Sequence, residues 1–478
     1  MDQPIYNNSK FNRSSTNFLL IFFSCCLLLC YNNANSEIRI LFVGDILLSR
    51  NVKTEIQTRH TFPWDKLKSN FQSADLVIGN LEGAVGESQE QTHFNFESPV
   101  FDINSSYINL LSKAGFKIIT VENNHSLDLG INGKKNTINA LQKCNISPVS
   151  LENSPQFFTV KGTVIALVAL NIVLGRDSLK SQLPSIEIKQ KLRLAKSLAN
   201  IVIVSIHWGS ELLDWPNREQ REKAKWLIKN GANIIIGSHP HVIQKPELID
   251  GVPVFFSLGN HLFDQKYLDT KEGLMIDIRI NNGEFRCEGI VTHTQQNSFY
   301  PEMIRQIDFG FGAIKLTNTD FRINNYTIKP LTVNDSIGNK VVLQAYENNQ
   351  MIWETHPMPV ISIATMRLDG KNDCLFMLEK HYSSLDREIS LRPYVYSVDN
   401  NGIYARWRGS ALAWPIIDAL ISPDNNKTLC VLHRGDSFIK IDKTNKIKRF
   451  AAYKWNGFGF TGIDDSKVCE SCAKLFEE

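Results

Sequence analysis

Seven short runs of Val, Ile, Leu and Phe between residues 37 and 263 constrain the fold more than any other feature of the sequence. Most of them lack alternating polar residues, which is the pattern of strands that are buried on both faces. Helical patterns separate several runs; residues 185–200, for example, carry four apolar residues at helical spacing. Alternating strands and helices predict an α/β layered fold with a largely parallel or mixed sheet. The runs lie at residues 38–44, 75–79, 116–121, 163–170, 201–206, 232–237 and 252–258.

The pattern changes after about residue 275. Runs such as 273–280, 312–318 and 340–346 alternate polar and apolar residues, and turns rich in Asn and Gly separate them. This pattern is typical of antiparallel strands. We therefore expect a first domain over residues 37–340 and a smaller β-rich C-terminal domain over residues 341–478. The second is expected to be a small sandwich or partial propeller, without an assigned role.

The N-terminus carries the pattern of a secretory signal. The apolar stretch at residues 18–31 follows Lys10 and Arg13, and small residues flank position 35. At 14 residues the stretch is shorter than the ~20 that span a bilayer. We interpret residues 1–36 as a signal peptide, cleaved or retained as an anchor. We thus expect export to the periplasmic or extracellular face of the cell envelope.

Charge and cysteine content narrow the functional classes. The 52 basic and 49 acidic residues nearly balance, and no basic run occurs, so the sequence gives no sign of nucleic-acid binding. Export permits disulfides, but the wide spacing of most cysteines does not dictate pairs. Cys469 and Cys472 form a lone CxxC, which favours a local disulfide or two free thiols over a zinc site.

Polar clusters follow six of the buried runs, each at its carboxyl end. In a parallel sheet these ends share one edge, so the clusters are expected to converge. Asp, Glu, His and Asn together are the ligands of a divalent cation, and two such ions can bind a phosphate-like group. Taken singly, each residue has a simpler explanation: a strand-end Asp often caps a helix, and a lone His often only forms a hydrogen bond. The clusters contain Asp45; Asn80 and Glu82; Asn124, His125 and Asp128; His207 and Glu211; His239 and His241; and Asn260.

These clusters together resemble a known motif series. The segments are GD at 44–45, GNLE at 79–82, NNHSLDLG at 123–130, HWGSE at 207–211, GSHPHV at 237–242 and SLGNHLFDQ at 257–265. In order and approximate spacing they resemble the bacterial capsule-biosynthesis, poly-gamma-glutamate synthesis protein family of the CapA type. That family is similar in fold to the calcineurin-like metallophosphoesterases. The resemblance covers about residues 37–340 and implies an α+β sandwich.

The resemblance implies a role for each matching position. His125 would contact substrate and donate a proton, and Asp128 would orient it. One or two divalent ions are implied, with Mn, Fe, Zn and Mg not distinguished. The implied metal ligands are Asp45, Glu82 (bridging), Asn124, His207, His239 and His241, and the implied substrate-binding residues are Asn80, Glu211 and Asn260.

Three positions depart from the pattern. The first motif normally has Asp-x-His, but Leu47 stands in place of the histidine. The second normally offers Asp where this chain has Asn80, so one metal is short of a ligand. His261 replaces the phenylalanine usual in the capsule family, which suggests either an added ligand or a tolerated aromatic exchange.

The leading hypothesis is an exported capsule (poly-gamma-glutamate) biosynthesis protein with a metal-dependent hydrolase site of the metallophosphoesterase type. Its expected partners are an anionic polymer such as poly-gamma-glutamate and membrane synthase subunits. One alternative is a non-catalytic polymer-binding or assembly factor of a capsule synthase complex. The other is a general secreted metallophosphatase.

Overall fold

The computed structural model describes residues 37–477, except residues 60, 88–98, 176–180, 296, 336–337, 369–372, 384–387, 409–411, 413–414 and 436–446. The expected signal peptide at residues 1–36 lies outside the described residues. Among the helices in the described part of the chain, none has the length and apolar character needed to cross a bilayer.

The first of the two large sheets of the N-terminal domain begins with β1, the first buried run of the sequence. Its neighbours β2, β5 and β6 continue parallel to it on one side, whereas on the other side β16, β17 and β18 each pair antiparallel with the strand before them in the sheet. The short strands β15 (Asn260–Leu262) and β19 (Ile314–Lys315) pair with β1 and β17. Across the sheet the order is β18 (Pro301–Asp308), β17 (Glu284–Thr294), β16 (Glu272–Asn281), β1 (Ile38–Ile46), β2 (Leu76–Leu81), β5 (Ile118–Thr120) and β6 (Ser147–Val149).

The second sheet holds the later buried runs. Its central strands β8, β9, β10 and β13 are parallel, and an antiparallel strand closes each edge. Apolar side chains from both sheets form one core between them, among them Ile40 and Phe42 from β1 and Ile203 from β9. The order is β12 (Glu247–Ile249), β13 (Val252–Phe255), β10 (Ile234–Ser238), β9 (Ile201–His207), β8 (Thr163–Asn171) and β7 (Gln156–Val160).

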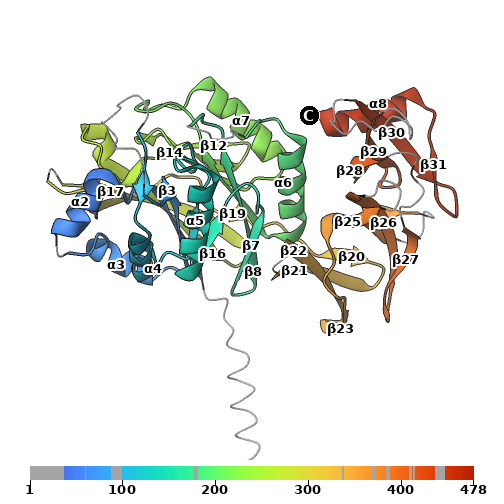
Figure 1. The fold of residues 1–478 in the computed structure, drawn as a ribbon. Coiled ribbons are helices and arrows are strands. Elements are labelled where there is room, and N and C mark those ends of the chain that lie inside the picture. The colour runs from blue at the N-terminus through green and yellow to red at the C-terminus, as the bar shows by residue number, and fades with distance from the viewer. Residues whose placement is uncertain are drawn as a thin grey trace, which may run out of the picture.

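Helices cover the outer faces of the two sheets, so the first domain is a layered α/β sandwich (Figure 1). The helix expected over residues 185–200 is α6, whose N-cap Ser185 accepts a hydrogen bond from the backbone N–H of Ile188. α7 begins with a capping box between Asn217 and Gln220. The helices are α2 (Arg50–Thr58), α3 (Lys68–Gln72), α4 (Ile108–Ala114) and α5 (Gly130–Lys143) beside the first sheet, and α6 (Ile186–Leu198) and α7 (Arg218–Lys229) beside the second.

Shorter elements connect these layers. Two small pairs, parallel β3 with β4 and antiparallel β11 with β14, lie outside the large sheets. They and the 3-10 turns are β3 (Ala84–Val85), β4 (Asp102–Ile103), β11 (Ile243–Gln244), β14 (Ser257–Leu258), η1 (Asp65–Leu67), η2 (Ser105–Tyr107) and η3 (Leu268–Lys271).

The C-terminal region is β-rich, as the alternating pattern predicts. Two antiparallel sheets lie beyond α6, coloured orange to red in Figure 1, and a last helix, α8 (Ser466–Glu477), packs on the second. Residue 340, the expected domain boundary, falls inside β22. The strands are β20 (Phe321–Ile323), β21 (Tyr326–Asp335), β22 (Gly338–Glu347) and β23 (Gln350–Glu354), then β24 (Val360–Arg367), β25 (Asp373–Ser383), β26 (Glu388–Asp399), β27 (Gly402–Arg408), β28 (Ile416–Ile421), β29 (Leu429–Arg434), β30 (Lys448–Trp455) and β31 (Phe460–Gly462).

A disulfide joins Cys430 of β29 to Cys472 of α8. The expectation of a local CxxC disulfide or of two free thiols is therefore wrong, and only Cys469 of that motif is free. The reason is that α8 packs against β29 and β30, which brings together two cysteines 42 residues apart. Sequence spacing could not reveal this contact.

Candidate metal centre

The predicted site residues meet where the carboxyl ends of both sheets come together. Contacts of 3.9 Å or less link all of them except Glu211 and the side chain of His239, whose ring centroid lies 4.8 Å from that of His207. The first sheet supplies Asp45, Asn80, Glu82, Asn124, His125, Asp128 and Asn260, and the second supplies His207, Glu211, His239 and His241.

Asp45, at the end of β1, is fully buried. Its Oδ1 accepts a hydrogen bond from Asn80 Nδ2 at 2.8 Å, and its Oδ2 accepts one from the backbone N–H of His239 at 3.2 Å. His241 Nδ1 lies 3.5 Å from the same Oδ2. Burial raises the pKa of Asp45 to about 6, against the smaller opposing effect of these hydrogen bonds. The carboxylate is thus fixed in orientation but is costly to keep charged.

Glu82 is the most unusual residue of the site. It is fully buried, and neither carboxylate oxygen has a hydrogen-bond partner among the described residues. Its Oε1 lies 3.9 Å from Nε2 of His125, 3.9 Å from Nε2 of His207 and 3.8 Å from Nε2 of His241, all too long for hydrogen bonds. Burial, followed by the charge of Asp45, raises the pKa of Glu82 well above its usual value.

This environment fits a bound cation. A buried carboxylate without a partner costs several kcal/mol, and a metal ion coordinated among the surrounding nitrogens would offset that cost. Carboxylate oxygens with imidazole nitrogens suit Mn, Fe and Zn in particular. The donor atoms around Glu82 therefore fit a divalent ion.

The histidines are suited to ligation because they are neutral. Burial lowers the pKa of His239 to about 4 and that of His241 to about 3, and it lowers that of His207 well below its usual value. His241 Nδ1 lies 2.9 Å from Asn260 Oδ1, which leaves Nε2 for the centre. His239 Nδ1 is buried without a hydrogen-bond partner in the described part of the chain. Near pH 7 these rings offer lone pairs in place of positive charge.

His207 is held from both sides. Its Nδ1 lies 2.8 Å from Ser238 Oγ, and its Nε2 lies 2.8 Å from Oδ1 of Asn124. The amide of Asn124 and the ring of His207, both predicted metal ligands, are therefore in direct contact.

His125 lies at the side of the centre with a fixed ring. Its Nδ1 is 2.8 Å from Asp128 Oδ2, which also accepts a hydrogen bond from the backbone N–H of Phe101. The ring stacks on Phe101 with 3.8 Å between centroids. Its Nε2, the nitrogen not bound to Asp128, lies on the side of Glu82. This arrangement suits a general acid that delivers a proton to the centre.

Two groups of side chains could hold a metal ion, each with ligand atoms within 4.8 Å of one another. The first group is Asp45, Glu82 and His207, which joins the two sheets. The second is Glu211, His239 and His241. Glu211, which the resemblance assigns to substrate, is exposed and could also serve as a ligand. The described residues can thus hold one ion or two.

Comparison with known proteins identifies the family. A family model of the bacterial capsule synthesis protein PGA_cap matches residues 39–265. The PGA biosynthesis protein CapA of Bacillus subtilis (strain 168) is 31% identical over 263 residues, covering 52% of this chain and 69% of that protein. This chain belongs to the PGA_cap family. The capsule biosynthesis protein CapA of Bacillus anthracis is 28% identical over 293 residues, covering 56% of this chain and 70% of that protein.

The expected resemblance to the capsule family is confirmed by these sequence relatives. Solved structures give weaker likenesses. A hypothetical protein from Thermus thermophilus is 17% identical, with 58% of this chain and all of that one covered, at a TM-score of 0.31. The assignment to the family therefore depends on the sequence matches.

The departures from the motif series have structural counterparts in this PGA_cap chain. Leu47 is fully buried and packs with Phe101 and Phe263, so an apolar contact stands where the phosphoesterase pattern has a ligand. His261 lies in the core, where its Nε2 accepts a hydrogen bond from Trp64 Nε1 at 3.0 Å. Of the two explanations for His261, the structure supports the aromatic exchange.

Two predicted substrate residues serve as buried supports. Asn80 holds Asp45 and also lies 3.5 Å from His207 Nδ1, and Asn260 holds His241. Both are at most 5% exposed. Their amide groups orient candidate ligands from behind, which is the usual role of outer hydrogen bonds in metal sites.

Sequence reasoning missed four residues of the site. Ser238 supports His207, and Phe101 covers His125. Arg50 forms an ion pair with Asp264 and lies over the Phe101 ring, 5.3 Å from its centroid. Ser238 and Asp264 lie inside the recognised segments at 237–242 and 257–265, and Arg50 follows Asp45 by five residues, which were the available signals.

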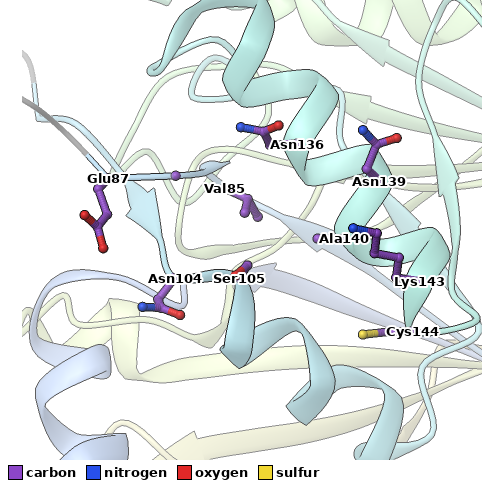
Figure 2. A pocket seen from close by; sticks show the side chains of 10 residues that line it. Val85, Glu87, Asn104, Ser105, Asn136, Asn139, Ala140, Lys143 and Cys144 are labelled. Carbon is purple, nitrogen blue, oxygen red and sulfur yellow. The ribbon is translucent and has the colours of Figure 1, made fainter.

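A separate hollow of about 500 Å³ lies along α5 (Figure 2). Asn136, Asn139 and Lys143 line it from the helix, and Asn104 and Glu87 from the opposite side. None of its lining residues belongs to the candidate metal centre. The hollow is thus distinct from the site described above.

Proposed function

We propose that this PGA_cap protein is an exported factor of capsule biosynthesis with a metal-dependent hydrolase site at the carboxyl ends of its two sheets. The observation that carries the proposal is Glu82, a buried carboxylate whose oxygens have no hydrogen-bond partner among the described residues and which lies among three imidazole nitrogens. A charge in that position is stable only beside a positive ion. Burying such a charge costs free energy, and a functional metal site explains why the protein places a carboxylate there.

The metal would be held by side chains from both sheets. Asp45, Glu82 and His207 form one ligand group, and Glu211, His239 and His241 the other. When bound, a divalent ion supplies Lewis-acid polarisation of a phosphoryl or acyl oxygen. Asn124 contributes an amide oxygen beside His207.

The chain's own residues supply the proton chemistry. His125 donates a proton from Nε2 to the leaving group, while Asp128 at Nδ1 fixes the ring's tautomer and orientation. Phe101 covers one face of His125 and limits its motion. Asn80 and Asn260 keep Asp45 and His241 in place during the reaction.

The relatives and the disulfide support the proposed substrate and location. Two relatives are named for PGA and capsule biosynthesis, which supports an anionic polymer such as poly-gamma-glutamate as substrate. We propose membrane synthase subunits as further partners. The Cys430–Cys472 disulfide supports an oxidising compartment outside the cytosol.

A second candidate is a non-catalytic assembly factor that binds the polymer. Leu47 favours it, because its buried apolar contact leaves the centre without one ligand of the phosphoesterase pattern. The first candidate is preferred because His125 and Asp128 form a complete acid pair that mere polymer binding does not require.

The experiment is a turnover assay on the purified protein supplied with Mn²⁺, using an aryl phosphate and gamma-linked glutamate oligomers. His125→Ala is expected to lower kcat by about 10²–10⁴-fold, the usual contribution of a general acid. His356→Ala, which removes an exposed histidine of the C-terminal region, is the matched control. Turnover of the aryl phosphate alone would indicate a general phosphatase. Absence of turnover on both substrates would support the assembly factor.

A further inference from the structure

Arg50 occupies a strained position next to the candidate centre. It is the first residue of α2 and follows Asp45 by five residues. Its φ is +52°, in the left-handed region that side chains other than glycine rarely adopt. Such a conformation persists only where the surroundings fix it, and it is common at functional sites. The contacts of the side chain show what fixes it here.

Asp264 fixes the guanidinium group. Arg50 Nε donates a hydrogen bond to Asp264 Oδ2 at 3.1 Å, and Arg50 Nη2 lies 3.0 Å from Oδ1. The backbone N–H of Asn51 donates to the same Oδ2. The Asp264 side chain is fully buried, whereas that of Arg50 remains 26% exposed. One edge of the guanidinium plane is thus fixed against the protein, while part of the side chain remains exposed.

Phe101 connects Arg50 to the catalytic candidate His125. The guanidinium carbon lies 5.3 Å from the centroid of the Phe101 ring, within cation–π range. The same ring stacks on His125 at 3.8 Å. The charge of Arg50 also reaches the centre: it opposes the rise that burial causes in the pKa of Glu82, and it adds to the fall that burial causes in the pKa of His241.

We infer that Arg50 is the oxyanion-binding residue of this site and holds the phosphoryl or carboxylate group of an anionic substrate next to the metal ligands and His125. Its ion pair with Asp264 uses Nε and Nη2, which leaves Nη1 to bind an anion. The ion pair with Asp264 pre-orients the planar group, so little entropy is lost when an anion binds. Of the side chains placed at the site, Arg50 alone carries a permanent positive charge.

This inference rests on the proposed function for the location of the reaction, but anion binding can be measured without turnover. The full-length protein is incubated with Mn²⁺, its metal content is determined, and inorganic phosphate and a short gamma-linked glutamate oligomer are titrated separately by calorimetry. Arg50→Met is expected to weaken binding of at least one anion about ten- to hundredfold, the range for a charged hydrogen bond. Its manganese content should equal that of the wild type.

Two further variants complete the test. Arg218→Met removes an exposed arginine of α7 and should bind both anions as the wild type does. Arg50→Lys keeps the charge but cannot form the planar contact with Asp264, so an intermediate affinity is expected. It also serves as the test variant if circular dichroism shows that Arg50→Met is unfolded.

The outcomes separate the two proposals. An Arg50-dependent loss for phosphate alone, or for the oligomer alone, supports the inference and identifies the substrate's anionic group. The same loss in a protein that binds no manganese keeps the inference and contradicts the proposed metal function. The inference is overturned if Arg50→Met binds both anions normally, if the wild type binds neither, or if manganese is lost together with the anion.

Discussion

At the residue scale, the candidate centre consists of groups held in protonation states unlike those in water. Burial makes the carboxylates of Asp45 and Glu82 hard to ionise and the three histidines hard to protonate. A bound cation would reverse the first effect and would benefit from the second. The same burial therefore makes the metal-free site costly and the loaded site stable.

Asp45 gives this cost a measurable pH dependence. Its folded-state pKa of about 6 is above its ordinary value of 3.8, so its contribution to stability is fully present below pH 3.8 and is lost as the pH rises through 6. With a chelator present, the free energy of unfolding should fall by about 2 kcal/mol more in the wild type than in Asp45→Asn between pH 4 and pH 7. Urea unfolding at each pH measures the free energy of unfolding of both proteins. The same pH dependence in the wild type and in Asp45→Asn would contradict the prediction.

The sequence predicted which residues meet and that Asp128 pairs with His125, but not the other contacts that support the site. Strand-end residues such as Asp45 and His207 could be identified because the carboxyl ends of parallel strands share an edge. The support that Ser238 gives to His207, and the ion pair of Arg50 with Asp264, depend on side-chain positions that residue order does not determine. The roles assigned to the individual ligands remain predictions.

At the element scale, the site depends on the close approach of β1 to the loop that begins β15. The backbone N–H of Asp45 donates to the carbonyl oxygen of Gly259 at 3.1 Å, and a Cβ added to Gly44 would lie 2.0 Å from that oxygen. Only glycine permits this backbone contact. It brings Asp45 and Asn260 into register on neighbouring strands.

Gly44→Ala is therefore expected to be strongly destabilising, because the obstacle is backbone that cannot rotate away. We expect a loss of about 3 kcal/mol in the free energy of unfolding, at the upper end for overpacking. Gly462→Ala, where a Cβ meets open space, is the control and should change stability little. Chemical denaturation compares the two; equal stability would show that the strands can separate without cost.

The elements themselves were predicted to different degrees. The continuous apolar runs and the helix over residues 185–200 could be recognised because burial on two faces and helical spacing leave clear patterns. The division of these runs between two sheets could not be predicted, because a buried strand has the same sequence pattern in either sheet. The Cys430–Cys472 pair also depends on tertiary packing.

At the scale of the whole molecule, the C-terminal β-rich region shares a core with the first domain. Apolar residues of α6, such as Leu192, belong to the same cluster as Leu375 of β25. Arg193 of α6 forms an ion pair with Asp418 of β28, which is fully buried, and Gln190 Nε2 donates to the carbonyl oxygen of Ile417. The C-terminal region thus stabilises the helix that covers the second sheet.

Arg193→Ala tests this contact. Removing the arginine leaves the buried Asp418 carboxylate without its cation, so a loss of about 3 kcal/mol is expected. Arg218→Ala breaks an exposed pair with Glu222 and should cost well under 1 kcal/mol. Urea unfolding measures both. Equal losses in the two variants would mean that the interface pair contributes no more than a surface one.

Metal content tests the central claim most directly. Glu82→Gln keeps the side chain's shape and removes its charge, and the exposed substitution Glu222→Gln is the control. We predict at least one equivalent of Mn, Fe or Zn in the purified wild type and control, and a rise in Tm on adding metal that corresponds to about 3 kcal/mol at a hundred times the Kd. Glu82→Gln should bind less than one equivalent of metal and show no rise in Tm on adding metal, while remaining folded. A wild-type protein with less than one equivalent of metal, and with no rise in Tm, would contradict the account.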